Sequence, residues 1–306
     1  MPVAPDATRV AHPLRARISF TSQRMFTMKL RKVTAASATV FALALTATAC
    51  GGNNSTGGDS GSGGGKSITV GIKFDQPGLG QKTPQGYAGF DVDVATYVAK
   101  KLGYNADQIE WKESKSGDRE TMLKRGDVDF IAATYSITPE RQKLVDFAGP
   151  YLLAHQDVLV RADDNKIKSP KDLNNAKLCS VTGSTSAQNV KDKLAPKAQL
   201  QPYPTYSACL PGLQNGAVDA LTTDDSILAG YAAQAQFKGK FKLGGFKLTN
   251  ENYGIGVKKG SDLKDKINKA LEDMVADGAW QKAVDKNLGP ANYKNEPAPK
   301  IGDIKS

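Results

Sequence analysis

Apolar and polar residues follow two different periods along the chain from residue 66 onward. Residues 68–72 alternate in the manner of a β-strand, and the apolar residues within 90–103 recur on one face of a helix. The same reasoning predicts strands around 109–111 and 129–132, with a helix near 121–124 between them. Strands that alternate with helices in this way are typical of an α/β domain with a largely parallel sheet.

Predicted strands again alternate with predicted helices after residue 156, and the last elements return to the first α/β unit. Strands are predicted at 157–161, 177–181, 218–221 and 252–257, and amphipathic helices at 263–275 and near Trp280. A second α/β unit therefore interrupts the first. We expect a first lobe at 66–158 and 252–296, a second lobe at 159–251, crossing segments near 158–161 and 251–255, and a loose tail at 297–306.

The residues before the first predicted strand have the composition of an export leader. Met28-Lys29-Leu30-Arg31-Lys32 is basic, and residues 33–49 carry no charge. This pattern predicts a signal peptide at 28–49, preceded by an upstream extension at 1–27. The sequence around Cys50 resembles a bacterial lipobox, so Cys50 is expected to carry a lipid; cleavage without a lipid is the alternative. The Gly/Ser-rich residues 50–65 are then expected to serve as a flexible tether to the outer face of the cell membrane.

The net charge of +10 comes largely from this leader. Seven basic residues and a single acid, Asp6, lie in residues 1–49. The rest of the chain lacks the clustered basic face with interleaved aromatic residues that nucleic-acid binding requires. We therefore expect no nucleic-acid partner.

Cys179 and Cys209 are the cysteines that remain after Cys50. An even pair in an exported domain predicts a disulfide, and two buried free thiols are the alternative. Two cysteines and an isolated His155 make a poor metal site, so we expect neither a metal nor a cofactor.

Polar side chains stand where several predicted strands end. Residues 133–141 run from a buried strand into a helix start, with Thr138 as N-cap and Pro139 next to it. Arg141 adds a planar fork that can bind a carboxylate through two hydrogen bonds. An ordinary capped helix with a surface arginine is the alternative interpretation.

Ligands of parallel α/β sheets bind beyond the carboxyl ends of the strands. The other polar residues at predicted strand ends are Lys73, Thr134, Ser136, Ser184, Thr185 and Asp224. Arg141 and the amides around Thr185 suit a carboxylate, whereas Asp224 suits an ammonium group. A carboxylate beside an ammonium group is the signature of an α-amino acid.

Six stretches together resemble a known family. They are Val70 to Gly78 (VGIKFDQPG), Gly89 to Asp93 (GFDVD), Ser136 to Arg141 (SITPER), Gly183 to Ser186 (GSTS), Val218 to Ala220 with Asp224, and Tyr253 to Ile255 (YGI). Their order and spacing resemble a family-3 extracellular solute-binding protein of a polar amino-acid ABC transporter, over about residues 66–290. Within that family the chain is most similar to actinobacterial glutamate-binding lipoproteins. The resemblance implies a periplasmic-binding-protein-like fold, with two α/β lobes and the ligand cleft between them.

The resemblance also implies the role of each site residue. Arg141 matches the arginine that binds the α-carboxylate, with Thr134 and Ser136 beside it. Thr185, with its flanking amides and Ser184, matches the carboxylate donor of the second lobe. Asp224 matches the acid that binds the α-amino group.

The distal end of the ligand is expected to meet two cations. Lys73 and Arg119 fall where glutamate-binding relatives place cations for the second carboxylate; a solvated lysine and a structural arginine are the alternative. Ser116 lies near a position where glutamine-binding members offer an aromatic side chain, so stacking on an amide is not favoured here.

The implied function is that of the extracytoplasmic binding component of an ABC importer. It would bind a polar L-amino acid, best of all glutamate, between closing lobes, act as a monomer, and deliver the ligand to a membrane permease. Glutamine or aspartate is the alternative ligand. A secreted enzyme similar to cyclohexadienyl dehydratase is disfavoured because no histidine except His155 lies near the candidate site. A ligand-sensing domain of a receptor or kinase is a further alternative.

Overall fold

The computed structural model describes residues 66–305, and the predicted extension, signal peptide, Cys50 and tether lie outside them. The strands there are β1 (Ile68–Ile72), β2 (Asp75–Gln76), β3 (Gly80–Thr83), β4 (Gly86–Ala88), β5 (Ile109–Glu113), β6 (Phe130–Ile131), β7 (Val145–Arg161), β8 (Lys177–Val181), β9 (Gln199–Tyr203), β10 (Ala220–Asp224), β11 (Phe241–Leu243) and β12 (Asn250–Lys258). The α-helices are α1 (Phe90–Lys101), α2 (Arg119–Arg125), α3 (Pro139–Gln142), α4 (Thr185–Asn189), α5 (Leu210–Asn215), α6 (Asp225–Ala232), α7 (Leu263–Ala276) and α8 (Ala279–Asn287). Short 3₁₀ or π turns cover Ala106–Gln108, Pro170–Asn175, Val190–Leu194, Ser207–Cys209, Ala235–Phe237 and Gly289–Ala291. Over residues 66–305, no helix has the length and apolar content needed to cross a membrane.

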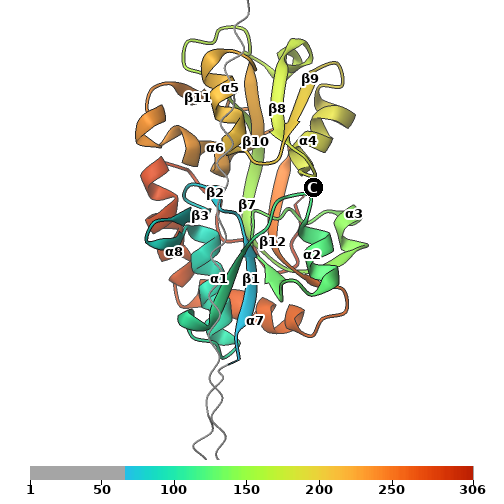
Figure 1. The fold of residues 1–306 in the computed structure, drawn as a ribbon, viewed down its shortest axis with the longest axis vertical. Helices are drawn as coiled ribbons and strands as arrows, with labels where there is room; N and C mark the ends of the chain where they lie inside the picture. Colours follow the sequence, from blue (N-terminus) through green and yellow to red (C-terminus); the bar gives the residue numbers. More distant parts are fainter. Residues whose placement is uncertain (1–65, 306) are drawn as a thin grey trace, which may run out of the picture. The chain divides into compact units, whose positions relative to one another are not determined.

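The main sheet contains two groups of parallel strands. Its order is β5-β1-β6-β12-β7-β10-β8-β9, with β11 also paired to β7. β1 is parallel to β5 and β6, and β8 is parallel to β9 and β10. β7 and β12 pair antiparallel to each other and join the two groups (Figure 1). The predicted architecture of two α/β lobes joined by two crossing segments is confirmed.

β7 carries the chain from the first lobe into the second. It pairs with β12 as far as His155 and with β10 from Gln156 onward. The amide of Gln156 also donates a hydrogen bond to the carbonyl of Thr249, which stands just before β12. The change of partner falls a few residues before the boundary expected at 158, and we propose that the lobes meet near residues 155 and 250.

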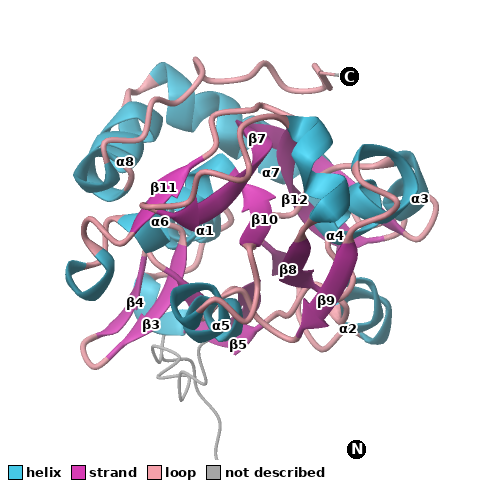
Figure 2. Cartoon of the chain, turned by 90° about the horizontal axis from the view of Figure 1, so that it is seen from above, coloured by secondary structure: helices cyan, strands magenta, loops and turns pink. Residues whose placement is uncertain are grey.

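The long helices α1 and α7 each turn an apolar stripe toward the sheet. α1 buries Phe90, Val94 and Val98, and α7 buries Ile267 and Leu271, as their helical spacing predicts. In the second lobe, α4 and α5 lie on opposite faces of β10, β8 and β9 (Figure 2). Burial of these stripes drives the packing and holds the strand ends in place.

β10 lies further along the chain than its apolar residues indicated. The prediction placed it at 218–221, but Thr222, Thr223 and Asp224 continue the pairing with β7. Asp224 is consequently the last residue of β10 as well as the N-cap of α6. The short strands β2, β3, β4, β9 and β11 were not predicted, because each has five residues or fewer and carries little apolar pattern.

The C-terminal segment, which we expected to be a loose tail, forms hydrogen bonds with the crossing strands. Asn252 and Lys305 exchange two hydrogen bonds, with the Asn252 amide nitrogen donating at 2.8 Å and its oxygen accepting at 3.0 Å. The amide of Gly302 donates to the carbonyl of Gly149, and Ile301 packs against the main apolar core. These residues form an ordered segment because the crossing strands offer them both partners and apolar surface.

Candidate functional site

Two buried cations lie together where strands of the first lobe end. Lys73 follows β1 and is 5% exposed, and Arg119 opens α2 and is 2% exposed. Lys73 Nζ donates to Ser116 Oγ at 2.9 Å. Burial, followed by the neighbouring Arg119, holds the pKa of Lys73 well below its usual value. Burial and then Arg141 lower the pKa of Arg119 to about 10, so this corner carries positive charge at neutral pH.

Arg119 retains an unused donor. Its Nη1 donates to the carbonyls of Ala133 at 3.1 Å and Thr134 at 3.4 Å, and its guanidinium lies 4.0 Å from the centre of the Tyr135 ring. Among residues 66–305, neither Arg119 Nε nor the side-chain nitrogen of Gln76 has a hydrogen-bond partner, although both are buried. Buried donors without partners are costly, which favours an anion or other acceptor at this place.

Thr134 is fixed in an unusual backbone conformation. Its φ of +45° lies in the left-handed region, which side chains other than glycine rarely adopt. Its amide donates to Asp91 Oδ2 at 2.9 Å, and its hydroxyl donates to Gln76 Oε1 at 3.2 Å. The Thr134 carbonyl accepts a hydrogen bond from Arg119 Nη1 at 3.4 Å.

Arg141 contacts both lobes. Its Nη1 donates to the Ser136 carbonyl at 2.8 Å, and its Nη2 donates to the Gly183 carbonyl of the second lobe at 3.0 Å. Its Nε lies 3.4 Å from Glu120 Oε1. The predicted capping is confirmed, since the Thr138 side chain accepts from the Arg141 amide.

Gly183 permits this close approach. Its φ is +76°, and a Cβ at this position would lie 2.7 Å from the Cα of Gly117 in the first lobe. A larger residue would hold the two backbones apart, so the glycine allows the lobes to meet.

The start of α4 faces the first lobe. Ser184 is the N-cap, and its hydroxyl accepts from the Ala187 amide at 3.0 Å. Thr185 Oγ1 lies 3.5 Å from Ser136 Oγ of the first lobe, and it donates to Glu251 Oε2 at 2.9 Å. The Thr185 hydroxyl predicted to bind a carboxylate is thus bonded to a buried acid that sequence reasoning missed.

Asp224 is buried at the end of β10, with 4% of its surface exposed. Its Oδ1 accepts from Ser186 Oγ at 3.3 Å, and its Oδ2 accepts from the Tyr253 hydroxyl at 2.5 Å. Burial, and then the nearby Glu251, raise the pKa of Asp224 well above its usual value. A cationic partner at this place would favour the ionised carboxylate.

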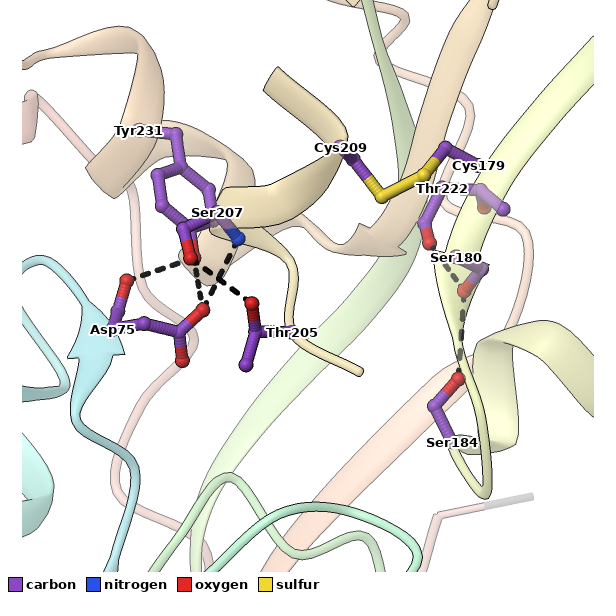
Figure 3. Close-up of a disulfide and its surroundings, with 9 residues drawn as sticks. All are labelled: Asp75, Cys179, Ser180, Ser184, Thr205, Ser207, Cys209, Thr222 and Tyr231. Carbon is purple, nitrogen blue, oxygen red and sulfur yellow. Dashed lines mark hydrogen bonds between the residues drawn. A yellow bond between two sulfur atoms is a disulfide. The ribbon is translucent and has the colours of Figure 1, made fainter. Parts of the chain in front are cut away.

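A separate set of bonds joins the lobes away from these residues. Asp75, on β2 of the first lobe, accepts from the Ser207 amide at 3.1 Å and from the Tyr231 hydroxyl through its Oδ2 at 3.1 Å (Figure 3). The Tyr231 hydroxyl also donates to the Asp75 carbonyl at 2.8 Å. Ser207 precedes Cys209, whose predicted disulfide to Cys179 is present with Cα atoms 5.9 Å apart (Figure 3). The lobes are therefore bonded to each other at more than one place.

The structure brings the predicted residues to facing edges of the lobes. Those of the first lobe are Lys73, Arg119, Thr134, Ser136 and Arg141, and those of the second are Ser184, Thr185 and Asp224. All but Thr185, which is half-buried, are buried. Sequence reasoning gave no role to Gln76, Asp91, Glu251 or Tyr253, all of which are buried. Gln76, Asp91 and Tyr253 lie in stretches that carry the family resemblance, which was the one signal that could have drawn attention to them.

A family profile matches most of this chain. The profile of bacterial extracellular solute-binding proteins, family 3, matches residues 68–290. The chain belongs to this family. The predicted resemblance is therefore confirmed, and the family's members are extracytoplasmic binding proteins by description.

Individual members of family 3 agree with this assignment. The glutamate-binding protein GluB of Corynebacterium efficiens is 48% identical over 87% of this chain and 92% of its own length. The glutamine-binding protein GlnH of Bacillus subtilis is 41% identical over 70% of this chain and 78% of its own length. Among solved structures, an ancestral arginine-binding protein bound to glutamine superimposes with a TM-score of 0.68 and 37% identity, covering 73% of this chain and 98% of the other. The prediction of an amino-acid-binding component of an importer is confirmed at the level of the family.

Proposed function

We propose that this family-3 protein binds L-glutamate between its lobes and delivers it to the permease of an ABC importer. The observation that carries the proposal is the pair of buried cations Lys73 and Arg119. Within residues 66–305 neither forms an ion pair within 4.0 Å, and Arg119 retains an unpaired donor. A carboxylate at the distal end of an amino acid would supply the missing charge.

The remaining charges fit the other end of the same ligand. Arg141, Ser136 and the amides around Thr185 stand on opposite sides of the cleft and suit the α-carboxylate. Asp224 suits the α-ammonium group, which would offset the cost of burying its charge. Because each lobe supplies part of the contacts, the ligand favours the arrangement in which the lobes meet, and we propose that the permease recognises this arrangement in a monomer.

A calorimetric titration of the purified protein with L-glutamate, L-glutamine and L-aspartate tests the ligand. Lys73→Met keeps the length and apolar stem of the side chain but removes the charge. We expect it to weaken glutamate binding by about 10- to 100-fold and glutamine binding much less, because only glutamate leaves a carboxylate unpaired.

Lys112→Met is the matched control, since Lys112 is an exposed lysine whose Nζ donates to the Asp127 carbonyl. It should leave both affinities unchanged. Equal losses for glutamate and glutamine in Lys73→Met would contradict a distal-carboxylate site. Preferred binding of glutamine, the ligand named for one relative, would retain the amino-acid clamp but change the specificity.

An enzyme on this fold is the second candidate, and we propose that the chain is not one. His155, the only histidine near the site by sequence, directs its Nε2 to Glu296 Oε1 at 3.2 Å. Asp224 has the surroundings of an ammonium-binding group, between two hydroxyl donors. Release of a product from arogenate or prephenate would contradict this proposal.

We also propose that a lipid on Cys50 anchors the protein to the outer face of the cell membrane. The uncharged stretch before Cys50 and the tether after it support the proposal. Fatty-acid labelling in cells should mark the wild-type protein and not the Cys50→Ser variant, and labelling of both would overturn it.

A further inference from the structure

Tyr253 lies where the two halves of the candidate site meet. It belongs to the crossing strand β12 and is fully buried. Its backbone forms an antiparallel bridge with Ser136 of the first lobe, and the next amide, of Gly254, donates to the Tyr135 carbonyl at 3.0 Å. Its hydroxyl reaches Asp224 of the second lobe. One residue therefore links the carboxylate-binding end to the acid expected to bind the ammonium group.

The contact between Tyr253 and Asp224 is short and specific. The hydroxyl donates to Asp224 Oδ2 at 2.5 Å, whereas Ser186 Oγ, the donor to Oδ1, stands at 3.3 Å. Ser226 Oγ lies 3.1 Å from the Tyr253 hydroxyl and can donate to it while that hydroxyl donates to Asp224. Together these hydrogen bonds hold the Asp224 carboxylate in one defined orientation.

Asp224 needs such support because its surroundings oppose its charge. It is buried, and the acids Glu251 and Asp225 lie close enough to raise its pKa. Tyr206, Tyr253 and Tyr293 are titratable groups that also interact with it. The hydrogen bonds of Tyr253 and Ser186 act in the opposite direction and favour the carboxylate.

We propose that Tyr253 is a positioning residue for ligand binding, which holds the Asp224 carboxylate toward the α-ammonium group from a strand shared by both lobes. The inference rests on the proposed function, since it assigns the ammonium group to Asp224. Tyr253 itself does not contact the ligand in this proposal. It acts through Asp224, and through β12 it ties the position of that acid to Ser136.

The variant Tyr253→Phe tests the proposal and retains the buried ring. The ring packs beside Tyr151, with ring centres 6.2 Å apart, so the variant keeps this apolar contact. The test compares the wild-type protein and the variant in their affinities for L-glutamate and for glutarate, which has both carboxylates but no ammonium group. We expect glutamate binding to weaken by about tenfold and glutarate binding to change by less than about twofold.

A double-mutant cycle with Asp224→Asn separates positioning from general damage. Once the acid is neutral, Tyr253→Phe should have little further effect on glutamate affinity, because the group it orients is lost. Tyr97→Phe is the control, since it removes a hydroxyl that donates to Asp277 at 2.6 Å on the surface of α1. It should leave both affinities unchanged.

The outcomes separate this inference from the proposed function. If wild-type protein binds glutamate but Tyr253→Phe weakens glutamate and glutarate equally, or the two substitutions are additive, the positioning role is overturned and the function stands. If wild-type protein binds no amino acid, the proposed function is overturned, and the inference with it.

Discussion

Buried acids form hydrogen bonds that hold the proposed binding residues in place. Asp91 is fully buried at the start of α1, where its Oδ1 accepts from the Tyr151 hydroxyl at 2.7 Å and its Oδ2 accepts from the Thr134 amide. The second bond stabilises a backbone conformation that threonine would otherwise avoid. Burial raises the pKa of Asp91 from 3.8 to about 6, so its charge state changes at mildly acidic pH.

Asp91 should therefore make stability depend on pH. Between about pH 4 and pH 6 the folded protein holds a proton on Asp91 that the unfolded chain has released, so the free energy of unfolding falls as the pH rises. Asp91→Asn lacks this titration. Urea unfolding of ligand-free protein should show that wild type loses up to about 3 kcal/mol relative to the variant from pH 4 to pH 7. A difference that does not vary with pH would contradict the assignment.

Among the secondary-structure elements, the crossing strands β7 and β12 connect the two lobes and position residues of the candidate site. β7 pairs with strands of both lobes, and β12 presents Tyr253 and Glu251 to the site. The C-terminal segment lies against these strands through Asn252 and Gly149. The segment follows the last residue that the family profile matches, residue 290. Its packing on strands shared by both lobes gives it a structural role.

Substitutions within the C-terminal segment should show that it is packed. Ile301 lies against the main core, whereas Ile304 is 44% exposed. We expect Ile301→Ala to lower the free energy of unfolding by about 1–2 kcal/mol, and Ile304→Ala by less than about 0.5 kcal/mol. Chemical denaturation of both variants measures the difference. Two equally small effects would indicate a loose tail after all.

For the whole molecule, we expect bonds between the lobes outside the candidate site to contribute to ligand affinity. The Asp75 side chain accepts hydrogen bonds from Ser207 and Tyr231 of the second lobe (Figure 3). Such bonds stabilise the arrangement in which the lobes meet whatever ligand is bound. They should change overall affinity without changing specificity.

Asp75→Ala should weaken the binding of glutamate and glutamine by the same factor, about tenfold, because a smaller fraction of the protein adopts the bound arrangement. Calorimetry gives the two affinities, and X-ray scattering of ligand-free protein should show a larger radius of gyration. Asp93→Ala is the control, since Asp93 accepts bonds from Lys286 and Asn287 of its own lobe. A change in the ratio of the two affinities would place Asp75 in the specificity pocket instead.

The sequence by itself determined the two α/β lobes, the cysteine pair and the family. Apolar periodicity and local turn chemistry act over a few residues, so strands such as 68–72 and the Thr138 cap could be predicted from the chain. The residues that support the site could not. No local pattern along the chain assigns Asp91, Glu251 and Tyr253 to the site, and only the tertiary packing brings them beside Thr134, Thr185 and Asp224. Their partners lie from 29 to 66 residues away, and the energy of a buried polar group depends on such partners.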